Sequence, residues 1–186
     1  MASLPTVRLK HAGIFVTDFP TMFDFYVKLF GFQVSDRVDA GERQTAFLTN
    51  DPASHHTFVI GTGRPVGSPS TVHQISFYVD TLDDVRRYWR AVKADGRARK
   101  WYTTTHGNAW SLYFWDPEDN RIEIYTDTPW HIPQPAGLDI DLDQSDDEIY
   151  RQTEAYVRAD PAFEPIGEWQ KKTAKNLGID GYKPKE

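Results

Sequence analysis

The sequence predicts an α+β fold: two tandem βαβββ units forming a curved mixed sheet around a central metal site, followed by a C-terminal helical tail. The first observation behind this prediction is an internal repeat with an offset of 62 residues, in which His11, Phe15, Asp18 and Tyr26 recur as His73, Phe77, Asp80 and Tyr88. The second is that each copy has the pattern of a strand opening on His, a turn at Asp and an amphipathic helix carrying the Tyr. The third is that a histidine at the start of two equivalent strands can place two imidazoles at one point, which indicates a metal centre.

The first unit is expected over residues 7–62. Residues 7–16 are rich in β-branched and aromatic residues, which is typical of a strand. A helix follows, with apolar residues at helical spacing and Gly31 as its stop. Short strands are predicted near 32–38, 43–49 and 56–61. The Gly-, Pro- and Ser-rich stretch 61–71 is the predicted linker to the second unit.

The second unit is expected over residues 72–128, which completes a paired domain spanning 1–135. A strand at 72–79 and a helix at 82–95, ended by Gly96, precede strands near 98–104, 109–115 and 121–126. The turn DPEDN joins the last two strands. The tail, 136–186, is predicted to contain one helix at about 146–159, opened by a capping box of Ser145 and Glu148. Its prolines favour a wrap over the body of the protein over a third domain.

Composition narrows the classes of function. The chain of 186 residues has a formal net charge of −6 and no basic block, which argues against a nucleic-acid partner. It contains no cysteine, so disulfides, thiolate ligands and a cysteine nucleophile are excluded. It shows neither the apolar run of a signal peptide nor a segment long enough to span a bilayer. We therefore expect a soluble cytoplasmic protein with no membrane partner, and the tail and exposed sheet edges would suit a homo-oligomer.

The last strand of the second unit supplies a third candidate metal ligand. Glu123 lies between Ile122 and Ile124, so its side chain points to the opposite face of the strand. The repeat places Gly61 at the equivalent position of the first unit, so no fourth ligand is expected there. His11, His73 and Glu123 would then form a two-histidine, one-carboxylate triad with open positions, which is typical of Fe(II) oxygen chemistry. A structural zinc site would be closed, and the alternative partner for Glu123 is Arg121.

One run of the sequence resembles the signature of the extradiol ring-cleavage dioxygenases. That signature has a His, a hydrophobic residue followed by Tyr, an Asp-Pro turn and a ligand Glu, matched here by His106, Leu112-Tyr113, Asp116-Pro117 and Glu123. Asp119 departs from it, because the family usually has Gly there, although Asp tolerates a left-handed backbone. The paired repeat is similar to the vicinal oxygen chelate superfamily. The tail resembles the ends of small one-domain members related to dihydroxybiphenyl dioxygenases.

The resemblance implies Fe(II) held by His11, His73 and Glu123, with a small aromatic diol and O2 as substrates. It implies extradiol cleavage of a catechol resembling 2,3-dihydroxybiphenyl, with His56 as the acid/base and Tyr113 and His106 as hydrogen-bond partners of the substrate. Which of His55 and His56 faces the site stays open, as do the catechol and the choice between Fe and Mn. The alternatives are a glyoxalase-like metal-dependent isomerase or transferase, and a non-catalytic binding protein of the same fold.

Overall fold

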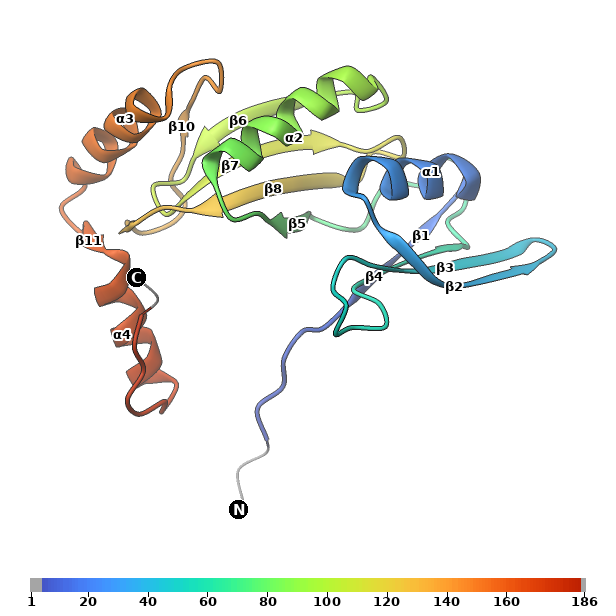
Figure 1. The fold of residues 1–186 in the computed structure, drawn as a ribbon, viewed down its shortest axis with the longest axis horizontal. Helices are drawn as coiled ribbons and strands as arrows, with labels where there is room; N and C mark the ends of the chain where they lie inside the picture. Colours follow the sequence, from blue (N-terminus) through green and yellow to red (C-terminus); the bar gives the residue numbers. More distant parts are fainter. Residues whose placement is uncertain (1–4, 185–186) are drawn as a thin grey trace. The chain divides into compact units, whose positions relative to one another are not determined.

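The computed structural model describes residues 5–184 and divides into two compact units. Unit 1 comprises the chain up to Thr71 together with Asp116–Asn120, and unit 2 comprises Val72–Trp115 and Arg121–Glu186. The boundary at residues 71 and 72 follows the predicted linker. The predicted α+β class and the two βαβββ units are confirmed, and the strands of each unit form a sheet of their own (Figure 1).

Unit 1 has a four-stranded mixed sheet with the strand order β1-β4-β3-β2. The edge strand β1 pairs in parallel with β4, whereas the other neighbours are antiparallel. Its elements are β1 (Ala12–Val16), α1 (Phe19–Phe30), β2 (Gln33–Ala40), β3 (Arg43–Thr49) and β4 (Phe58–Thr62). The fourth strand therefore begins two residues later than predicted, which leaves His55 and His56 in the loop before it.

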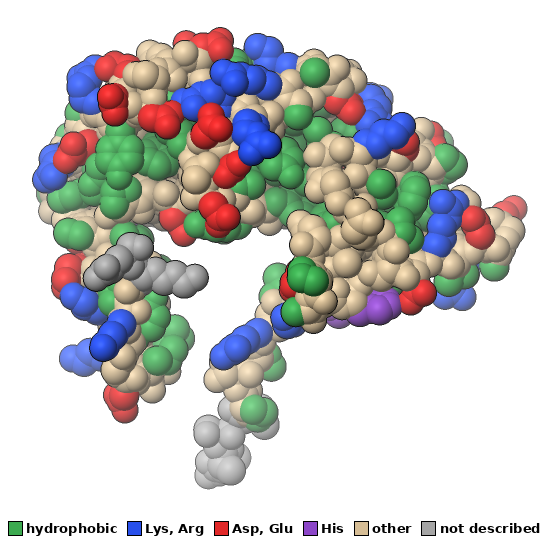
Figure 2. Space-filling model, viewed as in Figure 1, with side chains coloured by type: hydrophobic (Ala, Val, Ile, Leu, Met, Phe, Trp, Pro, Cys, Tyr) green, Lys and Arg blue, Asp and Glu red, His purple; other side chains and the backbone are tan. Residues whose placement is uncertain are grey.

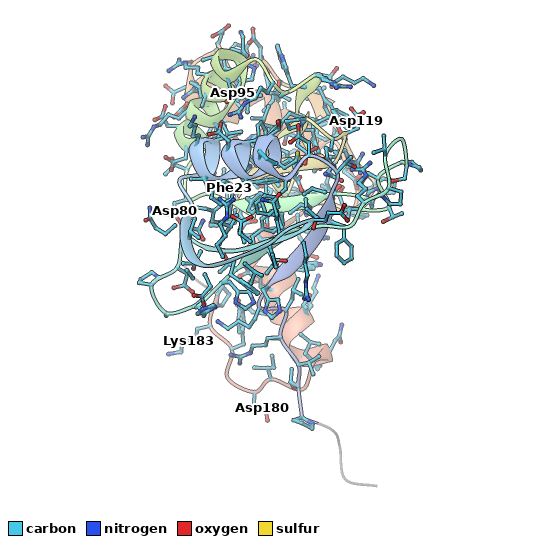
Figure 3. The ribbon with its side chains drawn as sticks, turned by 90° about the vertical axis from the view of Figure 1, so that its right-hand side faces the viewer. Phe23, Asp80, Asp95, Asp119, Asp180 and Lys183 are labelled. Carbon is cyan, nitrogen blue, oxygen red and sulfur yellow. The ribbon has the colours of Figure 1, made fainter. Side chains whose placement is uncertain are left out.

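Helix α1 is fixed by its ends and by one aromatic face. Asp18 caps its first turn by accepting a hydrogen bond from the Thr21 amide at 3.1 Å. Gly31 ends it with φ at 67°, a left-handed conformation that favours glycine. The buried Tyr26 ring packs 4.8 Å from Phe58 on β4, so the helix covers the sheet through aromatic contacts. Phe23, labelled in Figure 3, lies under the guanidinium of Arg37 on β2.

Unit 2 repeats this topology with a five-stranded sheet in the order β10-β6-β7-β8-β5. Its βαβββ elements are β5 (Ile75–Tyr78), α2 (Leu82–Asp95), β6 (Trp101–Thr105), β7 (Ala109–Trp115) and β8 (Arg121–Asp127). Helix α2 ends at Gly96 as predicted and packs on β7 and β8. Strand β5 pairs in parallel with β8, which matches the pairing of β1 with β4 in unit 1.

The C-terminal tail belongs to unit 2. Its elements are β9 (Trp130–His131), β10 (Leu138–Asp139), α3 (Asp146–Arg158), β11 (Glu164–Pro165) and α4 (Ile166–Asn176). Helix α3 matches the predicted helix, and its buried Thr153 accepts a hydrogen bond from the Trp110 indole of β7 at 2.8 Å. One helix was expected in the tail, whereas the structure has a second one, α4 (Figure 1), which contacts β9 and β11.

The capping box that opens α3 is half formed. The Ser145 hydroxyl accepts a hydrogen bond from the Glu148 amide at 3.3 Å, as a capping serine should. The Glu148 carboxylate instead accepts hydrogen bonds from Arg151 and Gln152 in the next turn of the helix. The reason is that charged and amide donors three and four residues along the helix lie within its reach.

The turn between β7 and β8 belongs to unit 1 by its contacts, although both strands belong to unit 2. Asp116 accepts hydrogen bonds from the Tyr26 hydroxyl at 2.8 Å and from the Asn120 amide at 2.9 Å. Asp119, labelled in Figure 3, has φ at 61°, so aspartate occupies the left-handed position as expected. The Glu118 carboxylate accepts hydrogen bonds from the backbone of Thr17 and Asp18, just before α1.

Within the described residues, no helix combines the length and the apolar character needed to cross a bilayer. On the face drawn in Figure 2, acidic and basic side chains are interspersed, without a block of one sign.

Candidate active site

Three neighbouring strands of unit 2 bring several of the predicted site residues together. Glu123 on β8 is the register partner of Tyr113 on β7 and of Ser76 on β5. Residues directly opposite one another on adjacent strands point to the same face of a sheet. Glu123 therefore lies between Tyr113 and Ser76 on one face.

This face lines a pocket of about 570 Å³. The pocket contains four of the residues singled out from the sequence, His73, His106, Tyr113 and Glu123. The remaining lining residues are Gln74, Asn108, Ala109, Tyr125, Gln134, Pro135 and Ala136. A concave site with apolar walls and a few convergent polar groups is the usual form of a small-molecule site.

Glu123 is a buried carboxylate, 7% exposed, held by neutral donors. Its Oε2 accepts hydrogen bonds from the Ser76 hydroxyl at 2.5 Å and from the Gln74 amide at 3.0 Å. Arg121, the alternative partner considered from the sequence, donates to the Gln74 carbonyl oxygen at 3.0 Å instead. No described Lys, Arg or His forms an ion pair with Glu123, and a buried carboxylate without a cation is costly. The pocket therefore has a carboxylate suited to a divalent cation.

Tyr113 and His106 form a connected pair at the pocket wall. The Tyr113 hydroxyl lies 3.0 Å from His106 Nε2, and His106 Nδ1 lies 2.7 Å from the Ala136 carbonyl oxygen. Because a carbonyl oxygen only accepts, the neutral His106 ring carries its proton on Nδ1 and receives the Tyr113 hydrogen bond on Nε2. Burial, followed by the adjacent Glu123, raises the pKa of Tyr113, so its hydroxyl remains a donor at neutral pH.

His73 stands at the pocket edge, in contact with Arg121. The Arg121 Nη2 atom lies 2.8 Å from His73 Nε2 and 3.1 Å from its Nδ1. A metal ion on either nitrogen would take the place of this donor. His73 can thus serve as a ligand once the guanidinium moves away from the ring.

The other predicted histidines lie in unit 1 and form a group of their own. The rings of His11 and His56 are 4.4 Å apart, and His56 Nδ1 lies 2.9 Å from His55 Nδ1. His55 turns its Nε2 to Asp36 at 2.8 Å, so it is His56 that contacts His11. Burial, followed by the charges of His11 and His55, lowers the pKa of His56, which favours the neutral, proton-accepting ring.

The three predicted metal ligands thus belong to different units. His11 is in unit 1, whereas His73 and Glu123 are in unit 2. Over residues 5–184, no three His, Asp or Glu side chains form a ready-made metal site. The ligand set consequently stays a prediction.

Two partners of Glu123 were not anticipated from the sequence: Gln74, which lines the pocket, and Ser76 on β5. Both bind Glu123, and both lie within three residues of His73 on the chain. The signal that could have found Ser76 is the parallel pairing of β5 with β8, which places it opposite Glu123.

The family model described as the Glyoxalase/Bleomycin resistance protein/Dioxygenase superfamily matches residues 8–124. The chain belongs to this superfamily. The match spans both βαβββ units and ends one residue after Glu123, so it includes every candidate site residue. The resemblance to the vicinal oxygen chelate superfamily is thereby confirmed.

Among curated proteins, biphenyl-2,3-diol 1,2-dioxygenase 3 of Rhodococcus globerulus is 28% identical to this chain over 127 residues. The alignment covers 66% of this chain and 64% of that protein, so the chain spans less than two thirds of its relative. This relative has the kind of activity that the sequence signature suggests.

Solved structures of the superfamily share the fold. The glyoxylase/bleomycin resistance protein/dioxygenase domain from Frankia sp. EAN1pec matches with a TM-score of 0.55 and 16% identity, covering 68% of this chain and all of that one, 100%. The fosfomycin resistance protein FosX from Listeria monocytogenes, complexed with Mn(II) and sulfate ion, matches with a TM-score of 0.52 and 17% identity. That match covers 67% of this chain and 95% of FosX, and at this identity both matches show the fold alone.

Proposed function

We propose that this superfamily member is an Fe(II)-dependent extradiol dioxygenase that cleaves a catechol resembling 2,3-dihydroxybiphenyl and inserts both atoms of O2. The observation that carries the proposal is the unit 2 pocket, which is lined by His73, His106, Tyr113 and Glu123. These are four of the six residues to which the family resemblance assigns metal binding and catalysis. The biphenyl-diol dioxygenase relative supports the same reaction class.

The proposed metal ligands are His11, His73 and Glu123. Two imidazoles and one carboxylate with open positions suit Fe(II), which supplies a one-electron route to O2 and binds vicinal oxygens. The buried Glu123 lacks a cationic partner among the described residues, which fits this role. Arg121 would have to leave the His73 ring when the metal binds.

The proposed roles of the other residues follow from their protonation. Tyr113 keeps its hydroxyl proton because burial raises its pKa, so it can donate a hydrogen bond to an ionised catechol oxygen. His106 orients that hydroxyl through its Nε2 and is itself held by the Ala136 carbonyl oxygen. Burial and the neighbouring histidines lower the pKa of His56, which favours the neutral ring that can accept a substrate proton and return it during ring opening.

The test is anaerobic reconstitution with Fe(II), followed by addition of 2,3-dihydroxybiphenyl and air. We expect a yellow ring-opened product and uptake of one O2 per catechol. Glu123→Ala is expected to lose both the iron and the activity. Tight binding of Zn, Ni or Mn without cleavage of any catechol in a panel would contradict the proposal and favour a metal-dependent isomerase or transferase. Absence of metal binding would favour a non-catalytic binding protein.

A further inference from the structure

Ser76 on strand β5 and Gln74 just before it bind only one of the two oxygens of the Glu123 carboxylate. The Ser76 hydroxyl and the Gln74 amide both donate to Oε2, at 2.5 Å and 3.0 Å. Within the described residues, neither of them donates a hydrogen bond to Oε1. Since a carboxylate oxygen accepts through two lone pairs, these two donors fill the capacity of Oε2.

Gln74 is itself locked in one orientation. Its carbonyl oxygen accepts from the Arg121 guanidinium at 3.0 Å, while its amide nitrogen donates to Glu123 and, at 3.0 Å, to the Ser76 hydroxyl. A flipped amide would turn its NH2 toward the Arg121 donor and its oxygen toward the Glu123 carboxylate, and both contacts would be repulsive. The contacts on both sides therefore determine which end of the amide faces Glu123.

We propose that Gln74 and Ser76 are positioning residues that hold Oε2 of Glu123 and leave Oε1 as the single oxygen for a metal ion. The inference rests on the proposed function, in which Glu123 is a ligand. It goes beyond that function by specifying how the carboxylate binds and which side chains impose it.

The number of open metal positions depends on this arrangement. Two histidines and one carboxylate oxygen leave three of six positions free, enough for the two oxygens of a catechol and for O2. If both carboxylate oxygens bound the metal, one of these positions would be lost. Side chains that orient a metal ligand through hydrogen bonds contribute strongly to the affinity for the metal. Their removal typically weakens metal binding by about 10–100-fold.

The test measures metal binding without turnover. Mn(II) is titrated into wild-type protein, Ser76→Ala, Gln74→Leu and Ser76→Thr, with calorimetry giving the Kd and water-proton relaxation giving the number of waters on the bound ion. We expect Ser76→Ala and Gln74→Leu to raise the Kd by about tenfold or more, and to lower the number of metal-bound waters by about one. Ser76→Thr keeps the hydroxyl and should restore both values.

A matched control is Ser111→Ala on β7. The Ser111 hydroxyl is buried and has no hydrogen-bond partner among the described residues, so its removal should leave Mn(II) binding unchanged. Ser76 is solvent-exposed, so Ser76→Ala should fold normally, which circular dichroism can verify. Failure of Ser76→Thr to rescue Ser76→Ala would show that the hydroxyl is not the cause and would overturn the proposal.

Glu123→Ala separates this inference from the proposed function. If Glu123→Ala binds Mn(II) as tightly as the wild type, the ligand set of the proposed function is wrong. If Glu123→Ala loses Mn(II) while Ser76→Ala and Gln74→Leu keep the wild-type Kd and hydration, the ligand set stands and the positioning role is wrong.

Discussion

Removing the hydroxyl of Tyr26 tests a structural role for the Asp-Pro turn. Tyr26 and Asp116 both have 0% exposure, and the hydroxyl donates to Asp116 Oδ2 at 2.8 Å. The Asn120 side chain also donates to Oδ2, at 2.8 Å. Tyr26→Phe therefore removes one hydrogen bond to a carboxylate without leaving that oxygen wholly unpaired, and it keeps the ring that packs against Phe58.

The expected loss of stability follows from the type of bond. A hydrogen bond to a charged group contributes about 1.5–3 kcal/mol, and because Asn120 still pairs with Oδ2 we expect about 2 kcal/mol for Tyr26→Phe. In a chain of this size, each kcal/mol lowers the melting temperature by about 2–4 °C, so a decrease of about 4–8 °C is expected. Burial already raises the pKa of Asp116, and the loss of a donor should raise it further.

Urea unfolding followed by tryptophan fluorescence measures this difference directly. The matched control is Tyr78→Phe, since Tyr78 is 52% exposed and its hydroxyl has no hydrogen bond among the described residues. We expect the control to lie within about 0.5 kcal/mol of the wild type, as is usual for a surface substitution. If Tyr26→Phe is equally neutral, the hydrogen bond to Asp116 does not stabilise unit 1 and the reasoning is refuted.

Three further outcomes are expected. Gly107→Ala should destabilise the protein by about 1–3 kcal/mol more than Gly67→Ala, as measured by thermal unfolding. Both glycines have positive φ, but a Cβ at Gly107 would lie 2.7 Å from the Ile132 side chain, whereas a Cβ at Gly67 would meet nothing within 4 Å. Equal losses of stability would show that the contact at Gly107 relaxes freely. Hydrogen bonds from the following turn of α3 lower the pKa of Glu148 to about 2, so an NMR titration should show it ionised far below its usual range. The stability it contributes should persist above its unfolded pKa and disappear as the pH falls toward 2, whereas an ordinary titration midpoint would contradict the helix contacts. His56→Ala should keep its metal, measured by atomic absorption, yet lose about 100-fold or more in kcat, and normal turnover would remove its acid/base role.

The fold was largely predictable because its signals are local. Helical spacing, a glycine stop and turn residues give α1 and α2, and the repeat then implies that the two units share one topology. The histidine pair was less predictable. The predicted strand at 56–61 begins only at Phe58, so His55 and His56 lie in a loop, where strand alternation does not determine their direction.

The tail was harder to predict because its elements depend on distant contacts. Strand β11 exists only by pairing with β9, and α4 follows it directly. Trp169 of α4 stacks on His131 at 5.0 Å, a contact that no local pattern reveals. Helix α3, in contrast, has a capping serine in the sequence and was correctly predicted.

The candidate site shows the same division between local and distant signals. Glu123 was predicted from strand alternation and from the family signature, and Tyr113 and His106 from the signature alone. The contacts that surround them, from Ser76 and Gln74 to Glu123 and from Arg121 to His73, depend on the parallel pairing of β5 with β8. Sequence periodicity predicts a strand, but it does not determine its neighbour or register.

The turn Asp116–Asn120 has a consequence for dividing the chain. A fragment ending at the linker, residue 71, would contain every strand of the first sheet but would lack this turn. The Tyr26 hydroxyl and the Thr17 and Asp18 amides would lose their carboxylate acceptors, and Arg64 would lose its ion pair with Glu118. We therefore expect the first half of the repeat not to fold stably on its own. Coexpression with a fragment that contains the turn should stabilise it.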